Sequence, residues 1–84
     1  MSSPRDRITA IASRMLLKRG VTAIPGSDDN LREAGLTSLD MVNLMLAIEA
    51  EFDFTIPQSD ITPENFQSVA TLERLVAGQL AQAA

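Results

Sequence analysis

A single serine is the side chain best placed to do chemistry in this sequence. Ser38 lies in the run Gly-Leu-Thr-Ser-Leu-Asp at residues 35–40. Gly35 permits a bend, and Thr37 with Asp40 three residues later fits a variant of the capping box, so we expect Ser38 to be the first residue of a helix. The unpaired amides and positive dipole end of a helix start stabilise anions, so a phosphodiester on Ser38 would be favoured there.

A simpler interpretation of the same residues is that Ser38 is itself the N-cap of this helix. Serine fills that position very often, and one serine is weak evidence for a modification site. The local motif leaves both interpretations open, so the neighbouring residues have to be considered.

These neighbours resemble the acyl carrier protein family, which includes peptidyl and aminoacyl carriers. The family pattern is Gly-x-Asp-Ser-Leu at the start of a helix that ends in Glu-x-x-Phe, followed by Ile-Pro; residues 35–39 and 49–57 match it, with Thr37 in place of the aspartate. The resemblance covers about the whole chain. It implies that 4′-phosphopantetheine, transferred from coenzyme A by a separate phosphopantetheinyl transferase, is attached to Ser38 and holds a substrate as a thioester. Thr37 bears on which transferase and partner enzymes recognise the carrier.

Length and composition argue against an enzyme. The 84 residues suffice for one small domain, residues 1–84, and contain neither cysteine nor histidine. A disulfide framework, a thiolate nucleophile and the commonest general base and metal ligand are therefore excluded. Catalysis would be restricted to carboxylates, hydroxyls and Lys18, and no acid/base pair with a pocket can be named.

Charge is distributed unevenly along the chain. Residues 1–32 carry six basic and three acidic side chains, whereas residues 33–84 carry one basic and eight acidic side chains. The acidic half would repel nucleic acid and attract a basic protein surface. An acidic face kept for solubility is an alternative explanation.

Other partners and compartments receive little support from the sequence. Asp28, Asp29 and Asn30 superficially resemble a calcium loop, but the rest of the ligand pattern is missing, so we expect no metal site. No signal peptide and no apolar run of about 20 residues is present, which favours a cytoplasmic protein that does not bind membranes. We expect it to be a monomer.

The hydrophobic pattern predicts an all-α fold, a small four-helix bundle. The expected helices cover about residues 4–19, 38–53, 63–66 and 69–82. Ser3 and Ser68 are the expected caps of the first and last helices. The third helix is short, and a long loop over residues 20–37 separates the first two. That loop is expected to pack through four apolar anchors: Val21, Ile24, Leu31 and Leu36.

The helix expected at residues 38–53 has two apolar faces. One face belongs in the core and contains Met41, Leu44, Met45, Ile48 and Phe52. The other contains Leu39, Val42, Leu46 and Ala50, flanked by Asn43, Glu49 and Asp53. An exposed apolar patch with a charged border is typical of transient docking sites, although the 20–37 loop could instead cover it. The predicted partner-binding residues are Leu39, Asp40, Val42, Leu46, Glu49 and Asp53.

We therefore interpret the chain as a discrete, non-catalytic carrier that presents an acyl or aminoacyl group to ligases, synthases and transferases. Asn43 and Ala50 stand where fatty-acid carriers commonly have acids, and with Thr37 this favours a specialised aminoacyl or unusual acyl carrier. The alternatives are a housekeeping fatty-acid-synthesis carrier, or an unmodified acidic helical interaction module in which Ser38 is only a cap.

Overall fold

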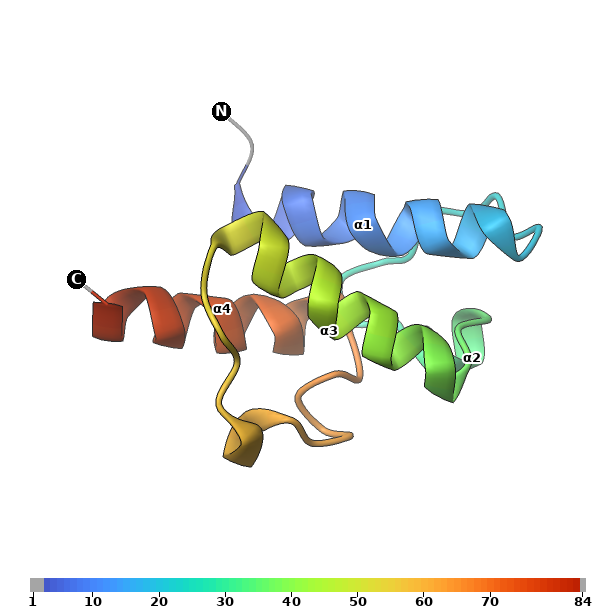
Figure 1. The fold of residues 1–84 in the computed structure, drawn as a ribbon. Helices are drawn as coiled ribbons and strands as arrows, with labels where there is room; N and C mark the ends of the chain where they lie inside the picture. The colour runs from blue at the N-terminus through green and yellow to red at the C-terminus, as the bar shows by residue number, and fades with distance from the viewer. Residues whose placement is uncertain (1–2, 84) are drawn as a thin grey trace.

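The computed structural model describes residues 3–83, which form an all-α fold as the sequence predicted. The elements are α1 (Pro4–Lys18), α2 (Leu31–Ala34), α3 (Ser38–Phe52), the 3-10 helix η1 (Gln58–Asp60) and α4 (Val69–Ala83). The three long helices dominate the molecule, with α1 and α4 antiparallel and α3 crossing them (Figure 1). Helix α1 packs against both α3 and α4, which places the core between the three.

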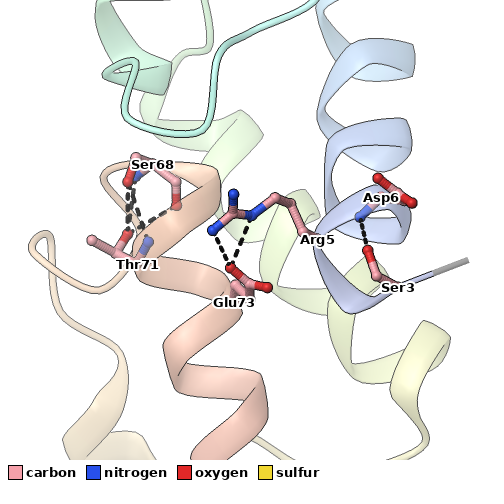
Figure 2. A network of polar contacts seen from close by, with 6 residues as sticks. All are labelled: Ser3, Arg5, Asp6, Ser68, Thr71 and Glu73. Carbon is pink, nitrogen blue, oxygen red and sulfur yellow. Dashed lines mark hydrogen bonds and ion pairs between the residues drawn. The ribbon is translucent and has the colours of Figure 1, made fainter.

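Short-range caps explain where the first and last helices begin. The Ser3 hydroxyl accepts a hydrogen bond from the Asp6 amide at 3.1 Å, and Pro4 takes the first helical position. Ser68 and Thr71 cap the start of α4 reciprocally, at 3.0 and 3.2 Å (Figure 2). Both predicted caps are thus present, and α3 ends where Asp53 adopts a left-handed conformation with φ 54°.

The core consists of aliphatic side chains from the long helices and from the segments between them. On α3, Leu44, Ile48 and Phe52 are buried, and Met41 and Met45 are half-buried against them, as the first apolar face predicted. The other buried hydrophobic residues are Ile8, Ile11, Ala12, Leu16, Leu31, Leu36, Ile56, Phe66, Val69, Leu72, Leu75 and Val76.

The segment between α1 and α3 differs from the prediction in two respects. It contains the one-turn helix α2, which begins where the Asn30 side chain accepts from the Glu33 amide at 3.0 Å. Leu31 and Leu36 are buried as expected, but Ile24 is exposed and Pro25 is buried instead.

Backbone hydrogen bonds to the start of α4 hold this segment in place. The Ser27 carbonyl accepts from the Ala70 amide, and the Leu31 amide donates to the Gln67 carbonyl, each at 2.8 Å. No local sequence pattern predicts these long-range bonds. They help to determine which side of the segment faces the core.

The predicted helix at residues 63–66 is wrong: these residues form a turn. Thr62 caps this turn, because its hydroxyl accepts from the Asn65 amide at 3.2 Å and its carbonyl from the Phe66 amide at 3.2 Å. Just after the turn, the Gln67 carbonyl accepts a hydrogen bond from the Leu31 amide of a distant segment. The short helical element of this region is instead η1.

Within residues 3–83 no helix has both the length and the apolar character that a membrane span requires.

Candidate modification site and docking face

Ser38 is the first residue of α3 and its side chain is exposed. Thr37 is the N-cap: its hydroxyl accepts from the Asp40 amide at 3.2 Å, while the Asp40 carboxylate accepts from the Thr37 amide at 2.9 Å. The predicted capping box is therefore present, and the alternative in which Ser38 is the N-cap is wrong. Its hydroxyl takes no part in starting the helix.

Two backbone donors remain available beside this hydroxyl. In the first turn of α3, the Asp40 amide is bonded to Thr37 Oγ1 and the Met41 amide to the Thr37 carbonyl at 3.1 Å. The amides of Ser38 and Leu39 have no intrahelical acceptor, and no other hydrogen bond within residues 3–83 uses them. The start of α3 can thus donate hydrogen bonds to an anion held on Ser38.

Asp40 is part of a second contact that the sequence did not reveal. The Arg19 Nη2 lies 2.8 Å from Asp40 Oδ1, and Arg19 Nε lies 2.9 Å from Oδ2. Hydrogen bonds from the guanidinium, together with the one from the Thr37 amide, lower the pKa of the Asp40 carboxyl to about 2. Asp40 is only 7% exposed, so placing it on the partner-binding surface was wrong: its carboxylate faces inward to α1.

A groove of about 580 Å³ opens beside Ser38, which lines it. The apolar lining comes from α3 and from the segment that precedes α4: Met41, Val42, Met45, Ile61, Pro63 and Phe66. Polar side chains complete the lining: Asn30, Arg32, Thr62, Glu64 and Gln67. No local pattern predicts this groove, because its lining residues come from segments far apart in the sequence.

The second apolar face of α3 is exposed along most of its length. Leu39, Val42 and Leu46 are 68%, 49% and 53% exposed, and Ala50 is also exposed. The segment between α1 and α3 therefore does not cover this face, and the alternative in which it does is wrong. We call Leu39, Val42 and Leu46 the docking face; a contiguous exposed apolar surface of this kind is typical of a protein interaction site.

The two acids predicted to border the docking face have different surroundings. Glu49 is half-buried, and its carboxylate accepts from the Ile56 amide at 2.8 Å, which holds the chain that leaves α3. Asp53 is exposed at the end of α3. Of the six predicted partner-binding residues, Leu39, Val42, Leu46 and Asp53 are thus free to meet a partner.

Comparison with known proteins identifies similar chains. Two aminoacyl carrier proteins of Bradyrhizobium diazoefficiens are similar to this chain over 76 residues, aminoacyl carrier protein 1 at 58% identity and aminoacyl carrier protein 2 at 41%. Each alignment covers 90% of this chain, and it covers 84% and 85% of the two relatives, respectively.

Solved structures of a carrier protein from Bradyrhizobium japonicum have the same fold. One structure shows the carrier in complex with glycine:[carrier protein] ligase, of which it is the cognate carrier, and with an analogue of glycyl adenylate. That carrier matches this chain with a TM-score of 0.78 at 56% identity, and the match covers 92% of this chain and 100% of that one. The other contains the glycylated carrier protein and matches with a TM-score of 0.74 at 56% identity, covering 87% and 99%.

The family model described as a phosphopantetheine attachment site matches residues 6–77, which include the capped start of α3, the groove and most of the helical core. Because this match spans most of the sequence, the chain belongs to the acyl carrier protein family, whose members carry covalently attached 4′-phosphopantetheine.

Proposed function

We propose that Ser38 is the attachment residue and that this protein carries an aminoacyl group on the phosphopantetheine arm. The observation that supports the attachment residue is the exposed Ser38 hydroxyl at the first position of α3, beside two unpartnered amides. A phosphodiester fits there because the amides and the dipole of the helix favour its negative charge. When bound, the arm supplies a thiol, which this cysteine-free chain lacks.

Attachment is a phosphoryl transfer from coenzyme A in which Ser38 provides the nucleophile. The Ser38 oxygen forms a bond to the phosphorus that bears the pantetheine arm, and the bond from that phosphorus to the bridging oxygen breaks, releasing adenosine bisphosphate. The hydroxyl proton passes to a base of the phosphopantetheinyl transferase. This chain has no histidine, and within residues 3–83 no carboxylate or lysine side chain is hydrogen-bonded to Ser38, so activation of the hydroxyl falls to the transferase.

The cargo is proposed from the relatives. Both are named aminoacyl carrier proteins, and the solved carrier is the cognate partner of a glycine ligase and is seen glycylated. This supports the specialised aminoacyl carrier over the housekeeping fatty-acid carrier. It also disfavours an unmodified interaction module, because the family is defined by its attachment site. Glycine is the first amino acid to test.

The protein's own part is to present the cargo, and we propose that it catalyses no reaction itself. An amino acid:[carrier protein] ligase would bind at the docking face, which lies on the same helix as Ser38 and begins next to it. Asp53, which is exposed at the end of this helix, would attract a basic ligase surface. We also propose a cytoplasmic location, as favoured by the sequence, which shows no signal peptide.

A loading panel tests the cargo. The phosphopantetheine-bearing protein is incubated with ATP and single amino acids in the presence of a glycine:[carrier protein] ligase, and in parallel with the general enzymes that load fatty-acid carriers. We expect the mass of one glycyl group to be gained and then lost on treatment with hydroxylamine, which cleaves thioesters. Efficient loading by the fatty-acid enzymes and by no amino acid ligase would contradict the aminoacyl assignment.

A further inference from the structure

We infer that Arg19 is a positioning residue for phosphopantetheine attachment, acting on Ser38 through Thr37 and Asp40. The inference rests on the proposed function of Ser38 and adds the residue that follows a different helix, 19 positions earlier in the chain. Arg19 follows the last residue of α1, so it ties the end of one helix to the beginning of another.

The contact has the geometry of a two-point clamp. Arg19 offers two nitrogens, at 2.9 and 2.8 Å, one to each oxygen of the Asp40 carboxylate. One of these oxygens also accepts from the Thr37 amide at 2.9 Å, and Arg19 Nη2 lies 3.4 Å from the Thr37 hydroxyl. A planar guanidinium paired with both carboxylate oxygens fixes orientation as well as distance, which a single ammonium cannot do.

The clamp fixes the residues on either side of the reactive hydroxyl. Thr37 precedes Ser38 directly, and Asp40 follows it by two positions, so the backbone between them is held at both ends. The two unpartnered amides, those of Ser38 and Leu39, belong to this held stretch. Arg19 also balances the Asp40 charge, so that a carboxylate in the first turn of α3 does not oppose the arriving phosphate.

Two other ion pairs within residues 3–83 connect helices but lie elsewhere. Arg5 pairs with Glu73 of α4 at 2.8 Å (Figure 2), and Arg7 pairs with Glu51 near the end of α3 at 2.8 Å. Their acidic partners are 30% and 37% exposed, compared with 9% for the Asp40 side chain. Arg5 provides the control, because it also joins α1 to another helix while its partner Glu73 lies on α4, outside the capped start of α3.

The experiment compares Arg19→Gln with Arg5→Gln in the full-length protein. Apo protein is incubated with coenzyme A and a phosphopantetheinyl transferase at a temperature at which circular dichroism shows every variant folded. Intact-mass time courses then give kcat and KM. Amide hydrogen exchange of residues 38–41 is measured on the apo protein as a second readout, independent of the transferase. If the Gln variant of Arg19 does not fold, Arg19→Lys is compared with Arg5→Lys in the same way.

We expect Arg19→Gln to lower kcat/KM by at least about fivefold, the factor that corresponds to one kcal/mol, with most of the loss in kcat. Exchange at residues 38–41 should be faster than in the wild type. Arg5→Gln should change neither readout by more than about twofold, and Arg19→Lys, which keeps the charge but not the fork, should recover part of the loss.

Two results would overturn the inference: modification of Arg19→Gln at the wild-type rate, or equal slowing by Arg19→Gln and Arg5→Gln. The latter would mean that Arg19 contributes only general stability. Failure of the wild-type protein to be modified at all would instead overturn the proposed function of Ser38, so the two failures can be distinguished.

Discussion

Thr37 and Asp40 bond to each other in both directions across the start of α3. The Thr37 hydroxyl accepts from the Asp40 amide at 3.2 Å, and the Asp40 carboxylate accepts from the Thr37 amide at 2.9 Å. Ser38 lies between them with its hydroxyl exposed. The pair thus performs the capping that a serine in this position often performs, which leaves Ser38 free for modification.

Removing the Thr37 side chain should weaken the start of α3. We expect Thr37→Ala to lower the free energy of unfolding by about 1 kcal/mol, because the Asp40 amide loses its acceptor. Thr37→Asp restores a good N-cap acceptor and should stay within about 0.5 kcal/mol of the wild type. Urea denaturation followed by circular dichroism measures both. An unfolding free energy of Thr37→Ala equal to that of the wild type would show that the Thr37 cap does not stabilise the helix.

Acid should weaken the fold partly through Asp40. Its folded-state pKa, lowered to about 2 chiefly by the Arg19 hydrogen bonds, lies below the ordinary aspartate pKa of about 3.9. The stability contributed by this shift is complete above about pH 4 and declines as pH falls toward 2. We expect the difference in unfolding free energy between the wild type and Asp40→Asn to narrow over this range. If the difference in unfolding free energy between the two proteins did not change between pH 6 and pH 2, the lowered pKa of Asp40 would be contradicted.

The backbone at Gly35 should not tolerate a side chain. Its φ is +136°, and a Cβ placed there would lie 3.2 Å from Val21 Cγ2 and 3.4 Å from Leu16 Cδ2. We therefore expect Gly35→Ala to cost about 1–3 kcal/mol in thermal or urea unfolding. Gly78→Ala is the control, because a Cβ there has no neighbour within 4 Å and α4 should gain about 0.5–1 kcal/mol. Equal effects of the two changes would argue against this conformation at Gly35.

The docking face should matter for ligase binding and not for folding. Leu46 on α3 is 53% exposed, and Leu17 on α1 is 61% exposed, so truncating either should alter stability little. We expect Leu46→Ala to weaken binding to an amino acid:[carrier protein] ligase by about fivefold to thirtyfold, as loss of a central apolar contact does. Leu17→Ala should change the dissociation constant by no more than about twofold. Isothermal titration calorimetry with the ligase measures both variants. If both leucines behaved alike, the ligase would not be using α3 selectively.

Local signals predicted the long helices and the capped start of α3 well. Three helix starts are marked by caps at Ser3, Thr37 and Ser68, and each cap is a contact between residues only three positions apart. The apolar period of α3 separates its buried face from the exposed Leu39, Val42 and Leu46. Local hydrogen bonds and periodicity determine both features, so one sequence suffices to find them.

The errors arose where distant residues decide the outcome. Asn30 and Glu33 do form a cap, but α2 has only four residues, too few for a hydrophobic period to register. The turn at residues 63–66 is followed directly by a long-range contact, in which the Leu31 amide donates to the Gln67 carbonyl. Likewise, Asp40 forms an ion pair with Arg19, which lies 21 positions earlier in the chain, and no local sequence pattern predicts this contact.

The most direct test of the central claim is intact-mass spectrometry of the protein before and after incubation with coenzyme A and a promiscuous phosphopantetheinyl transferase. Ser38→Ala is the control, because alanine keeps the first turn of α3 helical while removing the hydroxyl. We predict a gain of one phosphopantetheine group in the wild type, located on Ser38 by peptide fragmentation, and no gain in the variant. Modification that persists in Ser38→Ala, or no gain in the wild type with any of several transferases, would contradict the proposal.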